Sequence, residues 1–142
     1  MKSVADLLKL HSHPLRTITP DATVFEALQV LAEHEVGALL VVDGGRLAGI
    51  VSERDYTRKV ALQGKNSRDI RVSDIMTRDV VVVSPRSRSR ECMALMSSRR
   101  IRHLPVVDGD QPVGMLSIRD ILDDIIADQE ATIEQLEAYI KS

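Results

Sequence analysis

The pattern of apolar residues along this 142-residue chain predicts helices and strands in an order that occurs twice. Apolar side chains recur at helical spacing in TVFEALQVLAEHE (23–35) and again in RECMALMSS (90–98). Thr23 with Glu26 forms a capping box, which would satisfy free amides at the start of the first helix. The chain therefore contains two amphipathic helices that occupy equivalent places in the pattern.

Short extended segments lie on both sides of each helix. RTIT (16–19) and VVVVS (80–84) are predicted as short strands before the helices. The apolar runs that follow the helices are too short for helices and rich in valine, which predicts buried strands at ALLVVD (38–43) and HLPVVD (103–108). Tight hairpin turns at Asp43-Gly44 and Asp108-Gly109 then lead into the returning strands LAGIVS and PVGMLS.

A serine ends each returning strand at the point where a helix N-cap belongs. Ser52 and Ser117 each precede a further helix, and Gly64 is placed to end the first of these helices. Each unit thus reads strand–helix–strand–strand–helix. This order predicts an α+β (α/β) fold with two βαββα repeats and a C-terminal helix.

The two units form an internal repeat with a constant offset of 65 residues. A single unit of about 60 residues buries little of its surface, so we expect the copies to pack as a pseudo-twofold pair with two equivalent clefts between them. The expected domains are 1–65 (N-terminal segment and first repeat), 66–127 (second repeat) and 128–142 (C-terminal helical extension). Identical positions are Pro20/Pro85, Glu26/Glu91, Leu39/Leu104, Val41/Val106, Val42/Val107, Asp43/Asp108, Gly44/Gly109, Gly49/Gly114, Ser52/Ser117, Arg54/Arg119 and Asp55/Asp120.

Composition narrows the class of protein. The net charge of −2 and the 2% aromatic content disfavour nucleic-acid binding, which needs a basic face and often stacking rings. No apolar run approaches the ~18 residues of a membrane span, and the first residues do not resemble a signal peptide. The only cysteine, Cys92, cannot form an intrachain disulfide. We therefore expect a cytoplasmic protein that binds neither nucleic acid nor membrane.

The repeated motifs GALLVVDGGRLAGIVSERD and IRHLPVVDGDQPVGMLSIRD resemble a tandem pair of CBS domains, named after cystathionine beta-synthase. The resemblance covers roughly residues 12–127. It implies a regulatory module that binds AMP, ADP, ATP or NAD(H), with S-adenosylmethionine less favoured, and reports the ligand to a partner. The family's ligand motif has a glycine, two apolar residues, Ser or Thr, two variable residues and Asp. It is intact at 49–55 and at 114–120.

The resemblance places an adenosine beside each motif. Asp55 and Asp120 would accept hydrogen bonds from ribose hydroxyls, because a carboxylate offers two acceptor oxygens. Gly37 and Ala38 match positions on the adenine side and leave room for the base. Ser52 and Ser117 begin helices, whose free amides favour a phosphate.

Cations complete the predicted site. Arg102 and His103 stand where the family places phosphate contacts, and Arg54 and Arg119 adjoin the two aspartates. Arg58, Lys59 and Lys65 are weaker candidates.

Each of these residues also has a purely structural interpretation. The serines could be simple N-caps, the aspartates could stabilise helix dipoles, the arginines could be solvated, and His103 could be packed in a strand. The intact duplication of the motif favours the functional interpretation.

Other features point away from metals and towards a protein partner. His11 and His13 lack further ligands nearby, so we expect no metal site. Cys92 lies on a helix face and is expected in the core. Residues 76–105 are rich in arginine, whereas 120–137 contain seven acidic residues and no Lys or Arg. Ile126, Ile133, Leu136 and Ile140 follow a coiled-coil-like spacing interrupted by Gln129, so we expect the C-terminal helix to pack on a partner, first of all on its twin in a homodimer.

Three functions follow from these patterns in decreasing order of support. The first is an adenine-nucleotide sensor that signals to an unidentified protein in trans. The second is a ligand-free scaffold for dimerisation or docking. The third, an enzyme, is not expected, because the sequence contains no phosphate-binding P-loop and no usable Ser-His-Asp arrangement.

Overall fold

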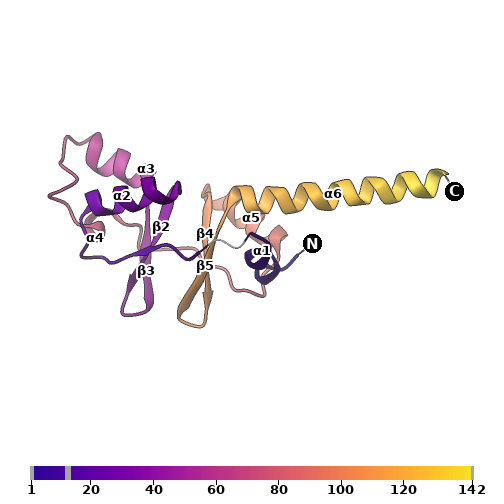
Figure 1. The fold of residues 1–142 in the computed structure, drawn as a ribbon, viewed down its shortest axis with the longest axis horizontal. Coiled ribbons are helices and arrows are strands. Elements are labelled where there is room, and N and C mark those ends of the chain that lie inside the picture. The colour runs from indigo at the N-terminus through magenta and orange to yellow at the C-terminus, as the bar shows by residue number, and fades with distance from the viewer. Residues whose placement is uncertain (1, 12–13, 142) are drawn as a thin grey trace. The chain divides into compact units, whose positions relative to one another are not determined.

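The computed structural model describes residues 2–11 and 14–141 and shows an α+β chain, as the sequence predicts (Figure 1). The chain folds into two compact units. Unit 1 comprises residues 1–13, 82–108 and 114–142, and unit 2 comprises residues 14–81 and 109–113. Each unit is built around one copy of the repeated hairpin and its helices.

Unit 2 contains the first repeat. Its three-stranded sheet has the order β1-β2-β3, with β1 parallel and β3 antiparallel to β2. One buried cluster joins α2 to this sheet, including Leu31, Leu39, Val41 and Val51, which places the apolar faces expected from sequence in one core. The elements are β1 (Thr17–Ile18), α2 (Val24–His34), β2 (Ala38–Asp43), β3 (Arg46–Ser52), α3 (Glu53–Tyr56), the π-helical turn η1 (Thr57–Ala61) and α4 (Val72–Ile75).

Local chemistry explains where the elements of unit 2 begin and end. Thr23 caps α2, because its side chain accepts a hydrogen bond from the amide of Glu26. Glu35 ends the helix in the left-handed conformation, with φ of 53°. The β2–β3 hairpin turns at Gly44 and Gly45, whose φ values of 59° and 81° suit the primed turns of two-residue hairpins.

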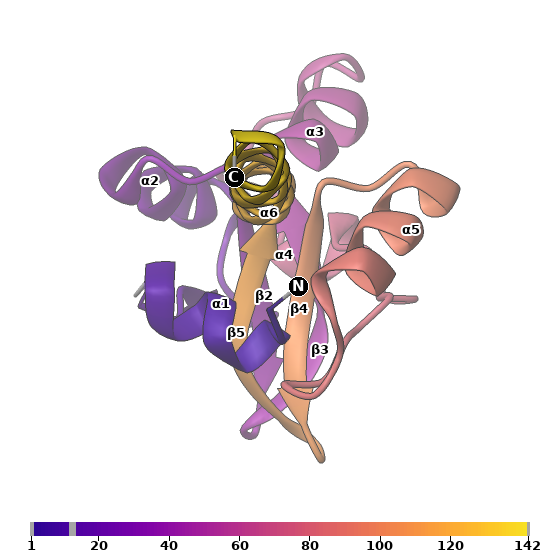
Figure 2. The same cartoon turned by 90° about the vertical axis from the view of Figure 1, so that its right-hand side faces the viewer.

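Unit 1 contains the second repeat and both ends of the described chain. Strands β4 and β5 form a two-stranded sheet, and Figure 2 shows α1 and α5 beside this hairpin with α6 seen along its axis. Arg100 ends α5 with φ of 55°, as Glu35 does at the equivalent position of the first repeat. The elements are α1 (Val4–His11), α5 (Ser89–Arg99), β4 (His103–Asp108), β5 (Gln111–Ser117) and α6 (Ile118–Lys141).

One local expectation from sequence needs correction. The segment 80–84 forms no full strand but a single parallel bridge from Val83 to Val106, since only Val83 aligns with β4. The helix after Ser52 is one α-helical turn followed by a π-helical turn. Gly64 ends it as expected, because its φ is 68° and the amides of Gly64 and Lys65 donate to the carbonyls of Ala61 and Val60 at 3.1 and 3.0 Å. The C-terminal extension expected from residue 128 is the continuation of α6, which begins at Ile118.

The N-terminal helix also differs from its expected place in the first repeat. The amides of Val4 and Ala5 donate to the carbonyls of Ser87 and Pro85, at 2.8 and 2.9 Å. Helix α1 therefore packs within unit 1, beside the second repeat. The helices of the described residues include none that is long and apolar enough to cross a membrane.

Each returning strand has a glycine at the equivalent position, Gly49 or Gly114, where another part of the chain comes close. The neighbouring atoms differ, which predicts different losses of stability when each glycine is replaced by alanine. A Cβ added at Gly49 would lie 2.6 Å from the backbone carbonyl oxygen of Thr77, whereas one at Gly114 would meet the flexible end of Leu8 at 2.8 Å. Because backbone cannot yield as a side chain does, we expect Gly49→Ala to lower the free energy of unfolding by about 2–3 kcal/mol and Gly114→Ala by about 1 kcal/mol. Urea unfolding of the two variants measures this. Equal losses would contradict the close approach at Thr77.

Candidate functional site

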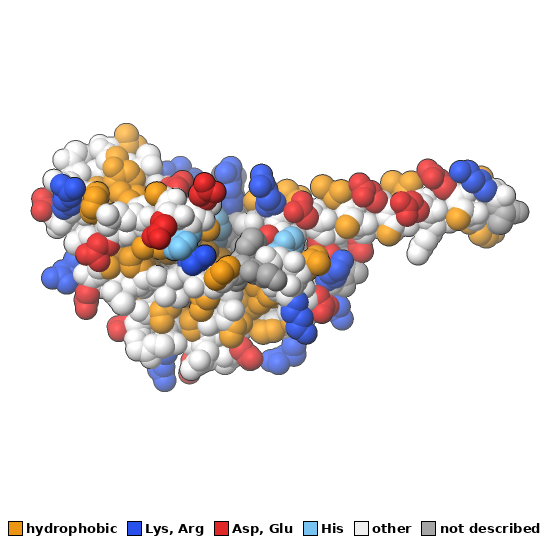
Figure 3. Space-filling model, in the orientation of Figure 1, with side chains coloured by type: hydrophobic (Ala, Val, Ile, Leu, Met, Phe, Trp, Pro, Cys, Tyr) orange, Lys and Arg blue, Asp and Glu red, His pale blue; other side chains and the backbone are white. Residues whose placement is uncertain are grey.

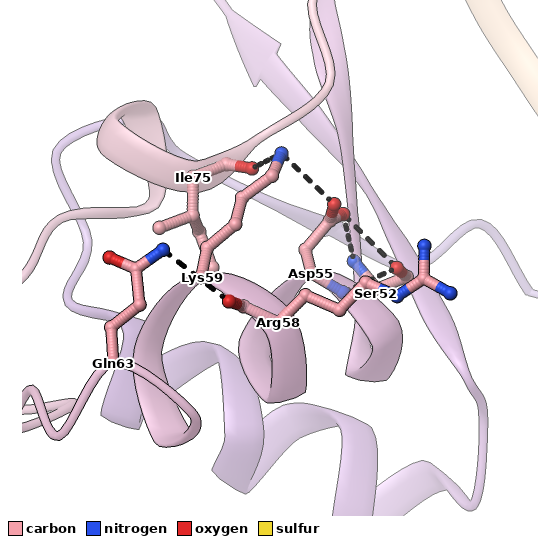
Figure 4. A network of polar contacts seen from close by, with 6 residues as sticks. All are labelled: Ser52, Asp55, Arg58, Lys59, Gln63 and Ile75. Atoms are coloured by element: carbon pink, nitrogen blue, oxygen red, sulfur yellow. Dashed lines mark hydrogen bonds and ion pairs between the residues drawn. The ribbon is translucent and has the colours of Figure 1, made fainter.

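The end of β3 and the start of α3 hold a compact polar cluster in unit 2 (Figure 4). The carboxylate of Asp55 accepts hydrogen bonds from the amide and the hydroxyl of Ser52, both at 3.0 Å. The amide of Asp55 in turn donates to the Ser52 hydroxyl at 3.1 Å. This reciprocal capping box forms because the two residues are three apart at a helix start.

Lys59 supplies a positive charge to this cluster. Its ammonium lies 3.2 Å from Oδ1 of Asp55 and donates to the carbonyl oxygen of Ile75 at 2.8 Å (Figure 4). The Lys59 side chain is 43% exposed and that of Asp55 13%. The cluster therefore contains a paired carboxylate and a cation that remains partly open to solvent.

The adenine-side residues lie beside the same cluster. Ala38 is buried and pairs with Ser52 across the β2–β3 ladder. The carbonyl oxygen of Gly37 accepts from the amide of Glu53 at 3.1 Å. The structure thus brings together the entry of β2 and the Ser-x-x-Asp segment.

Unit 1 repeats this arrangement with equivalent atoms. The amide of Ser117 donates to Asp120 at 2.9 Å, and the amide of Asp120 donates to the Ser117 hydroxyl at 3.4 Å. The amide of Ile118 donates to the carbonyl of Arg102 at 2.8 Å, as Glu53 does to Gly37. His103 begins β4 and is half-buried. The second predicted site is therefore assembled in the same way as the first.

Side chains from different elements approach the two carboxylates. Asp55 pairs with Lys59 of its own helix, whereas Nδ1 of His11, from α1, lies 3.6 Å from Oδ1 of Asp120. In the sequence, His11 is close to His13 and 109 residues away from Asp120, so its spacing suggests only a metal-binding role. Only the tertiary structure relates His11 to the candidate site.

The helix-start amides require a correction. The sequence predicts that they point outward towards a phosphate, yet those of Glu53 and Asp55 donate within the protein, as do those of Ile118 and Asp120. The carbonyls of Gly37 and Arg102 and the hydroxyls of Ser52 and Ser117 accept these hydrogen bonds. Ser52 is the N-cap of α3, and the Ser117 hydroxyl has the equivalent contact at the start of α6.

Exposed arginines adjoin both clusters. Arg54 and Arg119 directly precede Asp55 and Asp120, and both are exposed. Arg58 in η1 and Arg102 before β4 are exposed as well. Guanidinium groups bind phosphate oxygens in a bidentate manner, so each cluster has a source of positive charge at the surface.

A third acidic group was missed by the sequence analysis. Asp124 lies in α6, where the first repeat has Lys59, and its side chain is fully buried. Its carboxylate accepts from the hydroxyl of Ser89 at 2.7 Å and from the ammonium of Lys2 at 3.2 Å. Burial by itself raises the pKa of Asp124, but the hydrogen bonds from Ser89 and Lys2 outweigh it and hold the pKa below the ordinary value of 3.8.

The remaining candidate groups carry no chemistry that the site uses. Cys92 is buried in α5, and burial raises the pKa of its thiol to about 11, which suits a core residue better than a nucleophile. Among residues 2–11 and 14–141, no three His, Cys, Asp or Glu side chains gather as a metal site would require. His13 lies outside the described residues.

The fold and the duplicated cluster define a class of protein: a tandem module with two copies of one strand–serine–aspartate–helix arrangement. Comparison with known proteins agrees with this class. Residues 4–62 and 72–127 match the family model of the CBS domain, so the chain belongs to the CBS domain family, as its motifs predict.

Three related proteins illustrate the match. The chain is 40% identical over 128 residues to the mitochondrial CBS domain-containing protein CBSX3 of Arabidopsis thaliana, and the match spans 87% of this chain but 62% of the plant protein. It is 47% identical to a protein with CBS domains from Burkholderia ambifaria, with a TM-score of 0.83 over 90% of this chain and 96% of that one. A third structure is a CBS domain pair in complex with 5′-methylthioadenosine and S-adenosyl-L-methionine, 28% identical with a TM-score of 0.79 over 90% and 98% of the two chains.

Proposed function

We propose that this CBS pair is a sensor that binds an adenine nucleotide at each repeat and signals its presence to a protein partner. One observation carries the proposal: both repeats hold a Ser-x-x-Asp carboxylate at a strand end, beside an exposed arginine. The complex of a related CBS pair with two adenosine compounds supports an adenosine ligand. The AMP, ADP, ATP and NAD(H) of the sequence analysis remain the first candidates, with S-adenosylmethionine next.

The capped carboxylates offer acceptor oxygens to a ribose. A carboxylate has about four acceptor positions. Asp55 uses some of them for the two hydrogen bonds from Ser52 and the ion pair with Lys59, and Asp120 accepts from the amide of Ser117. A ribose at either repeat would displace or share some of these donors.

Base and phosphate would contact different groups. Gly37 and Ala38, at the entry of β2, would accept the flat adenine, because neither has a side chain that would occupy its space. Arg54, Arg58 and Lys59 at the first repeat, and Arg102, His103 and Arg119 at the second, would provide the positive charge for phosphates. Side chains rather than helix-start amides thus determine phosphate affinity in this proposal.

A thermal-shift series tests nucleotide binding. The full chain is heated alone and with AMP, ADP, ATP, NAD or S-adenosylmethionine at millimolar concentration, with GMP and GTP as matched controls. A ligand at about 100 times its Kd should stabilise the protein by roughly 2.7 kcal/mol, or about 6–10 °C in Tm. Absence of a shift with every adenine compound, or equal shifts with guanine nucleotides, would contradict an adenine site.

Regulation, not catalysis, is the proposed output. Nucleotide binding would shift the equilibrium between two conformations of the protein, and a partner protein in trans would bind one of them preferentially. We propose that the protein acts as a homodimer without enzymatic activity, without nucleic acid or membrane and without a metal. The buried, unpaired Cys92 fits the reducing cytoplasm as the compartment.

A ligand-free scaffold is the second candidate. The capping contacts of Ser52 and Asp55 form within the protein and need no ligand. In that case the alanine variants of both aspartates would keep full partner binding and dimerisation.

A further inference from the structure

Helix α6 exposes an apolar stripe beyond the part that packs within its own unit. Ile121 and Asp124 are buried in unit 1 and Ile125 is half-buried, whereas every residue from 129 to 141 is exposed. The stripe lies roughly a quarter turn around the helix from the packed face. Its apolar members are exposed by 38% at Leu122, rising to 80% at Ile140. Figure 3 shows these hydrophobic side chains alternating with acidic ones along α6.

The stripe has the spacing of a coiled-coil seam. Alternating steps of four and three residues connect Leu122, Ile126, Gln129, Ile133, Leu136 and Ile140. Under the heptad convention the isoleucines occupy every a position and the leucines occupy d, with a glutamine at the central d position. Isoleucine at a with leucine at d favours two parallel strands over higher oligomers.

The charged positions beside the seam select the direction of the partner helix. The e positions are Asp123, Glu130 and Glu137, and the g positions have no charge. In an antiparallel pair e faces e, so carboxylates would oppose one another. In a parallel pair, e faces g of the other chain. The g residues Thr132 and Tyr139 are uncharged, so they do not repel the acidic e residues.

Gln129 selects the register. A side-chain amide has both donors and an acceptor, so two Gln129 side chains that meet across a seam can satisfy each other. They meet only when two copies align in parallel and in register. A register shift by one heptad would place Gln129 against leucine and leave a buried amide without a partner.

We propose that two copies of this chain associate through α6 as a parallel, in-register, two-stranded coiled coil. The seam is self-complementary, as a twofold homodimer requires. An anionic membrane surface fits the stripe poorly, because the polar side of the helix is acidic rather than rich in Lys and Arg. This proposal deepens the homodimer part of the proposed function and requires no nucleotide.

Sedimentation equilibrium of the full chain without nucleotide tests the seam. The variant Ile133→Asp with Leu136→Asp is compared with Gln135→Asp with Ala138→Asp, which adds the same charges on the outer face of the helix. We expect the seam variant to raise the dimer Kd by at least about thirtyfold and the control to change it by less than about threefold. All four positions are exposed, so the folded unit is expected to keep its melting temperature.

A substitution that strengthens the seam gives an independent readout. Replacing the polar d residue by Gln129→Leu is expected to lower the dimer Kd by about tenfold, because a buried amide pair is exchanged for apolar contact. Gln135→Leu, outside the seam, is the matched control and is expected to leave the Kd unchanged.

Cysteine cross-linking tests direction and register. Leu136→Cys places two thiols together only in a parallel, in-register dimer, whereas Ala131→Cys places them on the outer faces. The native Cys92 is buried and present in both variants. We expect mild oxidation to link most of the Leu136→Cys protein into covalent dimers and little of the Ala131→Cys protein.

Three outcomes would overturn the proposal. They are a monomeric wild-type chain at about 100 µM, a seam variant that dimerises as tightly as its control, or equal cross-linking of the two cysteine variants. Because these measurements use no nucleotide, they fail or succeed independently of the thermal-shift series that tests the adenine site.

Discussion

Asp120→Ala is expected to weaken adenine-nucleotide binding at the second repeat by about 10- to 150-fold. Hydrogen bonds from ribose hydroxyls to a carboxylate contribute about 1.5–3 kcal/mol, which corresponds to that range in Kd. Asp55→Ala is expected to have the same effect at the first repeat. Isothermal titration calorimetry of each variant, with the nucleotide that gives the largest thermal shift, measures the loss and assigns it to one of two binding steps.

Controls separate ligand contact from helix capping. Asp79→Ala makes the same chemical change at an exposed position and should leave the Kd unchanged. Asp120→Asn keeps an acceptor for the Ser117 amide while removing the charge, so its Kd should fall between those of wild type and Asp120→Ala. If both alanine variants bind the nucleotide as the wild type does, the carboxylates serve the caps alone and do not contact the ligand.

Asp124→Ala is expected to produce the largest loss of stability, about 2–4 kcal/mol at pH 7. The change removes a fully buried carboxylate that holds Ser89 and Lys2, and it leaves the buried hydroxyl of Ser89 without its acceptor. Helix α6, the start of α5 and the segment before α1 are joined at this point. Urea unfolding followed by circular dichroism measures the free energy of unfolding.

Lys2→Ala is the matched control for Asp124. Its side chain is 43% exposed, so its ion pair is screened by solvent and should contribute less than about 1 kcal/mol. A loss in Lys2→Ala equal to that in Asp124→Ala would assign the stability to the surface charge rather than to the buried acceptor.

The contribution of Asp124 also predicts a pH dependence. Because the folded pKa lies below 3.8, this carboxylate stabilises the protein fully above that value, and the contribution is lost as the pH falls through the lower folded pKa. The difference in unfolding free energy between wild type and Asp124→Ala should therefore be constant from pH 7 to about 5 and shrink below about pH 4. A difference that stays constant down to pH 3 would contradict a depressed pKa.

Much of each repeat could be predicted from local sequence because local contacts build it. The valine-rich runs became β2 and β4 with the expected bounds, and Thr23 and Ser52 became N-caps. Capping contacts join residues three apart, so their spacing is visible in the sequence. The same locality explains why Ser-x-x-Asp was found as a motif while its role in capping and its role in binding could not be separated.

Failures of prediction occurred where the outcome depended on neighbours distant in sequence. Residues 80–84 have the composition of a strand, yet only Val83 finds a partner in β4. The amides of Glu53 and Ile118 at the helix starts are bonded to the carbonyls of Gly37 and Arg102. These acceptors come from the residues that lead into β2 and β4, not from the helices themselves. Composition gives the propensity of a segment to form a β-strand, but strand pairing also needs the free edge of another strand at hydrogen-bond distance.

Local sequence is enough to predict the order of elements within each repeat, the N-caps, the Ser-x-x-Asp motifs and the heptad spacing of α6, because each depends on residues within a few positions of one another. Only the folded chain shows which side chains lie beside these acids. Lys2 is 122 residues from Asp124, and His11 reaches Asp120 only because α1 packs within unit 1. Chain folding, rather than local spacing, brings such groups within hydrogen-bond or ion-pair distance, and it makes two repeats with one motif chemically different.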